Sequence, residues 1–305
     1  MDIRSLRHVV AIRKYGSFSR AAEALGVSQP TLSTSVARLE DQLQLKIFDR
    51  TAKGSTLTPV GELIVERANT VISETRDLAR DASLLAGGET GIVRIGCTTG
   101  LQSPLLGPLL GRIVSTHPDL KVHAEAASGA RLIPLLDSRD LDVVFTGSAP
   151  DRDAYVAETI LEAPSIFLAS PWHPLANERN IPTARLAQFK CGGSHSPGSS
   201  NPRLLGFESE LLGMYTASHY DILMPLVLRG DMALLMPSFV AQPYLEAGSL
   251  VALDTQWRHV QKYLFVTTRG TSHSPIVRQI RDHARAIGAQ LHDNWRNVAS
   301  RFTEG

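Results

Sequence analysis

Residues 16–43 read GSFSRAAEALGVSQPTLSTSVARLEDQL and contain two helical patterns separated by a short turn. In the first pattern the apolar residues fall at i, i+3, i+4 and i+7, one face of a helix; they are Phe18, Ala21, Ala22 and Leu25. Ser17 or Ser19 can cap the start of this helix, and Gly26 can end it in the left-handed conformation. The pattern predicts a short helix that ends at Gly26.

The second pattern begins two residues later, at the potential cap Ser28, with Pro30 in its first turn. Its apolar residues again share one helical face; they are Leu32, Val36, Leu39 and Leu43. The opposite face carries small polar residues and one cation, namely Pro30, Thr31, Ser33, Thr34 and Arg38. Two short helices joined by a glycine turn predict a helix-turn-helix.

The polar face of the second helix suits the major groove of double-stranded DNA. Its small hydroxyl side chains permit close approach, and Gln29 and Arg38 can reach base edges or phosphate. Ser28, Thr31 and Ser33 can bond phosphate through hydroxyl groups and helix-start N–H groups. An αα-hairpin with a solvated face has the same periodicity, so periodicity alone leaves both interpretations open.

Composition and charge set the class of protein. The 305 residues are 43% apolar and 20% charged, which fits about two folded domains and argues against a disordered chain. Residues 1–60 contain nine Lys or Arg against five Asp or Glu, although the whole chain has a net charge of only +1. That basic head is compatible with phosphate contact, although such an imbalance is more often just a solvated surface. Neither a signal peptide nor a membrane-spanning run is evident, so we expect a cytoplasmic protein.

Three segments of the head resemble the winged helix-turn-helix of LysR-type transcriptional regulators: Gly16–Ser33, Arg38–Glu40, and Leu45–Arg50 followed by Leu57–Gly61. The resemblance implies a recognition helix from Ser28 to Gln42 and a wing at residues 47–57. It implies DNA contacts by Ser28, Gln29, Pro30, Thr31, Ser33, Thr34, Arg38, Arg50 and Lys53. Many family members have basic or amide residues where this chain has Thr34, Ser35 and Ala37, so fewer base contacts are expected.

A long helix is predicted from Pro59 to Ala86, where Gly61 is the one glycine and no further proline occurs. Apolar or small residues recur at alternating steps of four and three, a heptad seam; they are Ile64, Ala68, Val71, Thr75, Leu78, Ala82 and Leu85. We interpret the seam as a homodimer contact, which would fix two recognition helices on a two-fold site. The alternative is a helix packed on its own domain.

The pattern changes after the glycine-rich segment 87–91. Strands are predicted at 92–96, 121–126 and 143–145, with helices from Ser103 and from Arg131 between them, an order typical of a parallel sheet. Ligands of such sheets bind beyond the carboxyl ends of the strands. These ends carry Thr98, Thr99, Gly100, Ser128, Gly129 and Thr146. Together with Arg131, they favour a small, anionic effector.

A second set of strands and helices follows, with strands at 166–169, 231–237, 250–253 and 263–267 and helices at 220–228 and 275–291. Pro171–Ala176 and Arg229–Val240 resemble the LysR effector domain. The resemblance implies two lobes, the first of residues 91–161 and 268–300 and the second of residues 162–267. Their cleft would add Ser194, His195 and Ser238 to the effector site, although the glycine- and serine-rich loop around His195 favours a solvated histidine over a ligand contact.

The expected protein is an α/β chain with a winged helix-turn-helix head at residues 1–58, a linker helix at 59–88 and a two-lobed effector domain at 89–305. Its expected partners are promoter DNA, a small-molecule effector, further copies of itself in a dimer or a dimer of dimers, and RNA polymerase. No catalytic motif, metal-ligand spacing or cofactor fingerprint is present, so neither an enzyme nor a bound cofactor is expected. Two alternatives stay open: a cytoplasmic solute-binding protein, and a redox-sensing regulator acting through Cys97 and Cys191.

Overall fold

The computed structural model describes residues 1–51, 54–85, 91–150, 153–194 and 215–303. Contacts divide the chain into two compact units, one of residues 1–88 with 138–140 and the other of residues 89–137 and 141–305. In the described part of the chain, no helix is both long and apolar enough to cross a bilayer.

The N-terminal unit contains α1 (Ile3–Tyr15), α2 (Phe18–Leu25), α3 (Gln29–Leu43), the hairpin β1 (Phe48–Thr51) and β2 (Gly54–Leu57), and α4 (Pro59–Leu85). The helix-turn-helix predicted from periodicity is confirmed as α2 and α3, and the wing as β1 and β2. Gly16 and Gly26 end α1 and α2 with φ of +72° and +65°, the left-handed values that glycine adopts without strain. Helix α1 was not predicted, although Asp2 caps it and accepts a hydrogen bond from the Ser5 N–H at 2.7 Å.

The core of this unit lies between its helices. Apolar side chains from all four helices and the start of the wing are buried together; they include Leu6, Val9, Ile12, Ala21, Ala22, Leu32, Val36, Leu39, Ile47, Phe48, Val65, Ala68 and Ile72. The first turns of α4 approach the wing closely at Gly61, where a Cβ atom would lie 2.1 Å from the Ile47 carbonyl oxygen. Thr58 caps α4, because its Oγ1 accepts from the Gly61 N–H at 2.8 Å.

The second unit is built on one nine-stranded sheet in the order β4-β3-β5-β11-β6-β9-β7-β8, with β10 also paired to β6. Strand β3 (Ile92–Cys97) lies parallel to both β4 (Lys121–Ala126) and β5 (Val143–Thr146), which confirms the predicted parallel arrangement. Connections run through η1 (Thr99–Leu101), η2 (Gln102–Leu106), α5 (Gly107–Thr116) and α6 (Gly129–Asp137). These elements form the first lobe.

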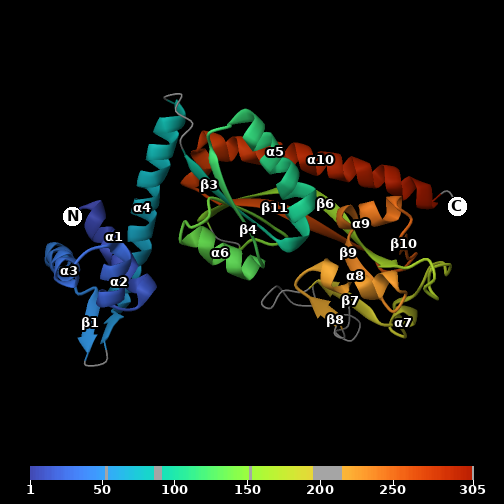
Figure 1. The fold of residues 1–305 in the computed structure, drawn as a ribbon, viewed down its shortest axis with the longest axis horizontal. Coiled ribbons are helices and arrows are strands. Elements are labelled where there is room, and N and C mark those ends of the chain that lie inside the picture. Colours follow the sequence, from blue (N-terminus) through green and yellow to red (C-terminus); the bar gives the residue numbers. More distant parts are fainter. Residues whose placement is uncertain (52–53, 86–90, 151–152, 195–214, 304–305) are drawn as a thin grey trace. The chain divides into compact units, whose positions relative to one another are not determined.

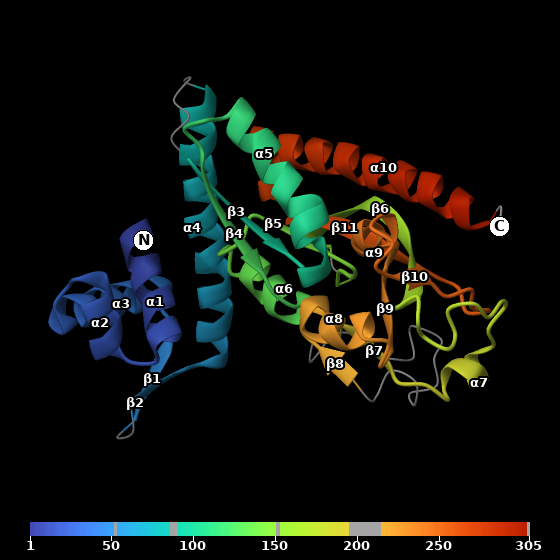
Figure 2. The same cartoon turned by 45° about the vertical axis from the view of Figure 1, so that its right-hand side comes forward.

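The second lobe contains α7 (Thr183–Leu186), β7 (Cys191–Ser194), β8 (Tyr215–Ala217), α8 (Tyr220–Leu228), β9 (Ala233–Pro237), α9 (Ser238–Glu246) and β10 (Val251–Ala252). Two long antiparallel strands, β6 (Tyr155–Ala169) and β11 (His259–Thr268), run through both lobes (Figure 2). The sequence predicted this region only in part: the strand predicted at 166–169 is the end of β6, and α7, β7, β8 and α9 were not predicted.

The two long strands bend at one place. Residues 264–267 of β11 pair with β5, just before residue 268, where the family resemblance places the return to the first lobe. The register of β6 and β11 shifts between Tyr263 and Leu264, at a bulge that skips Ile160. The bulge bends the strands where the chain passes from one lobe to the other.

Helix α10 (Pro275–Thr303) follows η4 (Thr271–His273) and runs over this crossing (Figure 1). A Cβ atom at Gly288 would lie 2.0 Å from the Ile160 carbonyl oxygen, so the helix backbone rests directly on the bulge. Arg281 and Arg285 pair with Glu158 of β6, and Trp295 packs against the core of the second lobe. The closing helix thus contacts both lobes.

Candidate functional site

The start of α3 is held by its own hydroxyl groups. Ser28 caps the helix, with its Oγ 3.3 Å from the Thr31 N–H and 2.7 Å from Thr31 Oγ1. Pro30 occupies the first turn, where its missing N–H costs no hydrogen bond. Because both hydroxyls are exposed, they can exchange this bond for one to a phosphate oxygen.

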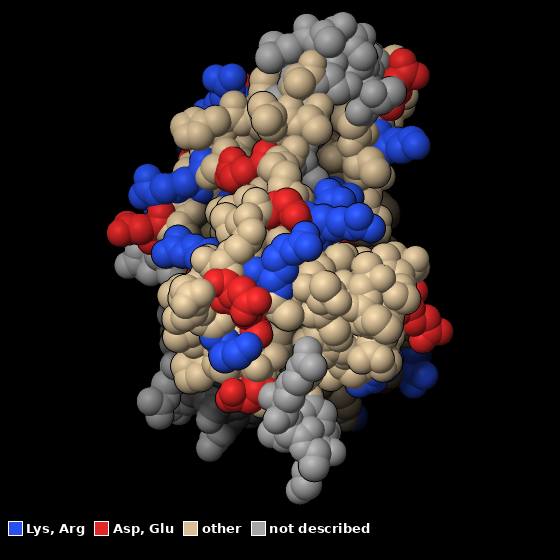
Figure 3. Space-filling model, turned by 90° about the vertical axis from the view of Figure 1, so that its left-hand side faces the viewer, with Lys and Arg blue, Asp and Glu red and all other residues tan. Residues whose placement is uncertain are grey.

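The outer face of α3 is solvent-accessible as the sequence predicts. Gln29, Pro30, Thr31, Thr34 and Arg38 are exposed and Ser33 is half-buried, whereas the opposite residues Leu32, Val36 and Leu39 are buried. On the face drawn in Figure 3, Lys and Arg side chains are interspersed with Asp and Glu and do not form one continuous basic surface. Hydroxyl and amide groups are therefore expected to supply many of the contacts.

Glu40, on the buried side of α3, ties this helix to the wing. Its Oε1 accepts from the N–H groups of Ile47 at 2.8 Å and Phe48 at 3.1 Å, and its Oε2 lies 3.0 Å from Lys46 Nζ. Burial opposes ionisation, but the N–H of Phe48, the ammonium group of Lys46 and the N–H of Ile47 together lower the pKa of Glu40 below its ordinary value. Sequence reasoning noted Glu40 only as part of a motif and did not assign this role.

The two predicted wing contacts are only partly located. Arg50 lies in β1 opposite Ser55 of β2, one residue from the tip of the hairpin. Lys53 lies outside the described residues. Phe18 of α2 packs edge-on against Phe48 of β1, with ring centroids 5.4 Å apart, so the wing is anchored to the helix-turn-helix as well as to Glu40.

The heptad seam of α4 is buried in its first half and exposed further along the helix. Ala68 is buried in the core of its own unit and Ile64 packs against that core, as the single-domain alternative requires. Val71 and Leu78 are 42% and 70% exposed, however, and nothing in the described part of the unit covers them. The distal half of α4 therefore offers an apolar stripe to a second chain.

The predicted effector loops of the two lobes meet at Ser218. The Ser218 carbonyl oxygen accepts from Thr99 Oγ1 of the first lobe at 3.1 Å and from Ser194 Oγ of the second at 3.4 Å. Gly100 faces Tyr220, whose ring lies 3.6 Å from the position a Cβ would take. Ser218 and Tyr220 were not identified from the sequence, because neither follows a strand end in a recognisable motif.

The remaining first-lobe residues are close to one another. Gly129 begins α6 so near to Thr146 that its Cβ position lies 3.1 Å from Thr146 Oγ1, and that oxygen accepts from the Ser148 N–H at 3.4 Å. Thr98 and Ser128 are half-buried. Ser128 directly precedes Gly129, and the Thr98 N–H donates to the carbonyl oxygen of Phe145, next to Thr146, at 2.9 Å. Arg131 pairs with Glu125 at 2.7 Å, so its charge is already balanced and no longer favours an anionic effector.

Two second-lobe residues complete the predicted set. His195 lies outside the described residues. Ser238 begins α9 and is fully buried, and its Oγ has no hydrogen-bond partner in the described part of the structure. Nearby, Phe239 packs edge-on against Tyr263 at 5.1 Å. Burial raises the pKa values of both Tyr220 and Tyr263, which keeps these phenols neutral.

The two thiols are poorly placed for redox chemistry. Cys97 and Cys191 are buried and free, and burial raises their pKa values to about 12 and about 11. Their strands, β3 and β7, are separated in the sheet by four others. At about 4.8 Å per strand, that separation is on the order of 24 Å, far beyond disulfide reach.

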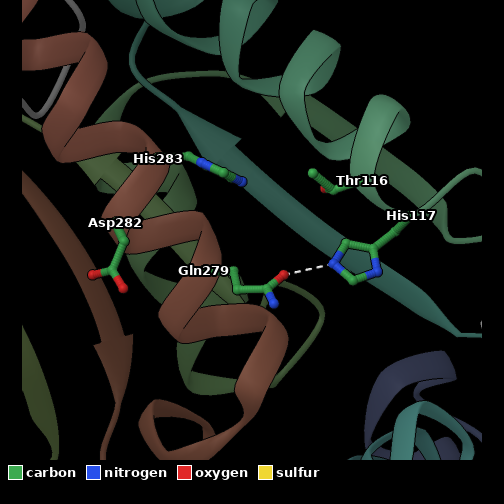
Figure 4. Close-up of a pocket in the computed structure, with 5 residues that line it drawn as sticks. All are labelled: Thr116, His117, Gln279, Asp282 and His283. Atoms are coloured by element: carbon green, nitrogen blue, oxygen red, sulfur yellow. Dashed lines mark hydrogen bonds between the residues drawn. The ribbon is translucent and has the colours of Figure 1, made fainter. Parts of the chain in front are cut away.

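A separate cavity of about 360 Å³ lies between α5 and α10 and is lined by Thr116, His117, Gln279, Asp282 and His283 (Figure 4). His117 Nε2 lies 2.5 Å from Gln279 Oε1, and Asp282 points away from the other side chains. No group of three or more His, Cys, Asp or Glu in the described ranges is arranged to hold a metal ion. The side chains that line this cavity therefore do not form a metal site.

Family models match both units. One described as "Bacterial regulatory helix-turn-helix protein, lysR family" matches residues 3–62, and one described as "LysR substrate binding domain" matches residues 86–288. The two matched ranges correspond to the winged helix-turn-helix with the start of α4 and to most of the sheet-containing unit.

Similar proteins span nearly the whole chain. The "DNA-binding transcriptional dual regulator OxyR" of Escherichia coli (strain K12) is 27% identical over 302 residues, covering 98% of each chain. The "SDS degradation transcriptional activation protein" of a Pseudomonas species is 29% identical over 289 residues, covering 92% of this chain and 94% of that protein.

Solved structures show the same fold. A full-length OxyR variant from Pseudomonas aeruginosa aligns with a TM-score of 0.69 at 21% identity, covering 93% of this chain and 95% of that chain. Full-length LysG from Corynebacterium glutamicum, solved with bound effector Arg, aligns with a TM-score of 0.65 at 17% identity, covering 95% of this chain and 99% of that chain.

Proposed function

This chain belongs to the LysR family of bacterial transcriptional regulators, and we propose which of its surfaces contact DNA, a second chain and the effector. It is a DNA-binding regulator with an effector-binding domain, in a family whose members bind DNA and small-molecule effectors and form oligomers. In our proposal α3 enters the major groove and the wing follows the phosphate backbone. The contacts come from Ser28, Gln29, Pro30, Thr31, Ser33, Thr34, Arg38, Arg50 and Lys53.

One observation carries the DNA-binding assignment. The polar face of α3 is exposed except at half-buried Ser33, its apolar face is buried, and Glu40 fixes the wing to the same helix. Groove and backbone contacts are thereby held in one rigid piece, which is what recognition through a winged helix requires. With few cations on the helix itself, each lysine or arginine that reaches phosphate contributes a large share of the salt dependence.

A dimer places two such heads on one operator. The exposed stripe at Val71 and Leu78 supports pairing of the α4 helices of two chains, and two dimers would form the larger assembly. The protein would act in the cytoplasm, where promoter DNA and RNA polymerase are found.

The effector is proposed to bind between the lobes. Thr98, Thr99, Gly100, Ser128, Gly129 and Thr146 would line the first lobe, and Ser194, His195 and Ser238 the second. The meeting of Thr99 and Ser194 at Ser218 supports this location, because a ligand entering there would exchange inter-lobe hydrogen bonds for its own. Different lobe arrangements would then favour different spacings of the heads and different bends in the DNA.

Peroxide sensing is the second candidate, since several similar proteins are described as hydrogen peroxide-inducible genes activators. Peroxide reacts with thiolates, and the buried, high-pKa thiols of Cys97 and Cys191 are poor sources of thiolate. We therefore favour a non-covalent effector.

The test compares two substitutions in the full-length protein. Arg50→Ala should weaken binding to all duplexes alike and reduce the slope of log affinity against log salt by about one unit. Ser33→Ala should instead change the preference among sequences at an unchanged slope. Exposed Glu23→Ala, on α2, serves as the control for general effects of substitution. An unchanged slope for Arg50→Ala would remove that residue from the phosphate contacts.

A further inference from the structure

The start of α9 has no side-chain cap. The helix is nine residues long and begins at Ser238, directly after β9, and its N-cap position is Pro237, which makes no side-chain cap hydrogen bond. The first N–H groups of any helix lack partners within the helix. Here the N–H groups of Ser238, Phe239 and Val240 make no hydrogen bond to the part of the chain that the structure describes.

Ser238 adds a second unsatisfied donor at the same place. Its side chain is 0% exposed, and its Oγ has no partner among the described residues. Because the Cα–Cβ bond of a helical residue tilts toward the helix N-terminus, this hydroxyl lies at the same end as the free N–H groups. Buried polar groups in proteins are nearly always hydrogen-bonded, so several unsatisfied donors in one place indicate an absent acceptor.

The location agrees with the lobe interface. Strand β7 runs parallel to β9 with Gly193 opposite Leu235, so Ser194 and Ser238 both leave the sheet at the same edge. Ser194 reaches Ser218, which also accepts from Thr99 of the first lobe. Helix α9 contacts β6, one of the two strands that join the lobes (Figure 1).

Three of the other candidate donors are already engaged. Thr99 and Ser194 donate to the Ser218 carbonyl oxygen, and Arg131 is paired with Glu125. A ligand would have to break these interactions in order to use those groups. The start of α9 requires no such exchange.

From these four observations we infer that the start of α9 is the subsite for a carboxylate group of the effector. The carboxylate would accept hydrogen bonds from the Ser238 hydroxyl and the first N–H groups of α9. A helix N-terminus carries partial positive charge and stabilises an anion, and a carboxylate offers two acceptor oxygens to several donors. The inference rests on the proposed inter-lobe effector site and assigns the anionic end of the ligand to the second lobe.

The test uses acetate as the probe and acetamide, its neutral analogue, as the matched control ligand. Thermal unfolding of the full-length protein is followed at constant ionic strength in increasing concentrations of each. Acetate should raise the unfolding temperature of the unsubstituted protein more than acetamide does, because binding to the folded state stabilises it. Equal shifts with the two probes would overturn the inference.

Ser238→Ala is compared with Ser115→Ala, which removes an exposed hydroxyl from α5, outside the proposed effector site. Ser238→Ala should weaken the apparent affinity for acetate about tenfold or more, the loss expected for one hydrogen bond to a charged group. Ser115→Ala should leave it unchanged. If Ser238→Ala left the acetate effect unchanged as well, the carboxylate would bind elsewhere and the inference would be wrong.

Thermal unfolding without acetate or acetamide tests whether the Ser238 hydroxyl is unsatisfied in the free protein or already has a structural partner. If its hydroxyl is unsatisfied in the free protein, Ser238→Ala should not lower the unfolding temperature, because no hydrogen bond is lost. A clear decrease would mean that Ser238 already has a structural partner, which contradicts the inference. Salt-dependent retention of DNA is measured on the same samples, so failure of the subsite is distinguishable from failure of the proposed DNA-binding function.

Discussion

The two units present their functional groups in opposite ways. In the N-terminal unit Thr31, Thr34 and Arg38 stand exposed on one face of a single helix. In the effector unit Thr146 and Ser238 are buried and come from strand ends 92 positions apart in the sequence. A groove of DNA can be met by one convex surface, whereas a small molecule has to be surrounded by several segments.

In both units a glycine lets a long helix pack directly against a backbone carbonyl group. Gly61 of α4 lies against Ile47 in the first unit, and Gly288 of α10 lies against Ile160 in the second. In both cases the contact is between backbones, which cannot rotate away as a side chain can. In each unit, one methyl group added at this glycine should therefore disrupt the packing of the long helix.

The largest effect is expected for Gly61→Ala. Its Cβ would lie 2.1 Å from the Ile47 carbonyl oxygen, so α4 and the wing must separate, at the upper end of or beyond the roughly 1–3 kcal/mol that overpacking costs. We expect DNA binding to be lost while the effector unit retains its unfolding transition in calorimetry. Gly288→Ala should instead destabilise the effector unit and leave the unfolding transition of the N-terminal unit unchanged.

Gly111→Ala is the matched control, since nothing lies within 4 Å of its Cβ position in the middle of α5. There alanine should be neutral or stabilising, because glycine is a poorer helix former by about 1 kcal/mol. If Gly61→Ala resembled Gly111→Ala in stability and in DNA binding, the close packing of α4 on the wing would be wrong.

The next effect concerns association. Leu78→Asp alters a side chain that is 70% exposed in the single chain, so the stability of the monomer should hardly change. On the proposed seam it places a carboxylate on each chain, where close like charges cost several kcal/mol. Light scattering should show the mass of a monomer and operator affinity should fall; a dimer of normal mass would contradict the proposed role of α4.

Glu40→Gln should have an effect of about 1.5–3 kcal/mol on the N-terminal unit, the usual contribution of hydrogen bonds to a charged group. Because the pKa of Glu40 is lowered in the folded state, its stabilisation is fully present above the ordinary glutamate value and is lost as the pH falls through the lowered one.

Denaturant unfolding between neutral pH and about pH 3 tests this dependence. The difference between the unsubstituted protein and Glu40→Gln should be largest near neutral pH and should shrink in acid. Exposed Glu23→Gln should show little difference at any pH. A gap between the unsubstituted protein and Glu40→Gln that stayed constant into acid would show that the charge of Glu40 is not what anchors the wing.

The smallest effect is expected from the cysteines. Both thiols are buried with raised pKa values, so the folded protein should react slowly with a thiol reagent at neutral pH. Peroxide should leave the DNA affinity of the unsubstituted protein and of Cys97→Ala unchanged. Rapid labelling, or a peroxide response that Cys97→Ala abolishes, would restore the redox alternative.

Local patterns were the most predictable. Helices α2 and α3 and strand β4 match the predicted segments, since their caps, glycines and periodicity act within a few residues. Helix α1 was missed although its apolar residues and the cap at Asp2 form a readable signal. Strand β7 carries the sequence Cys-Gly-Gly-Ser, which has no strand pattern, and it forms because β8 and β9 pair with it on both sides.

Local sequence predicts which segments form helices, where those helices end and which face of α3 is exposed, because these properties depend on neighbours one or two turns away. Only the folded chain shows that Glu40 anchors the wing, that Ser218 joins the lobes and that the hydroxyl of Ser238 is buried without a partner among the described residues. Each of these depends on groups brought together by folding, and the pairing of distant strands leaves no periodic trace in the chain.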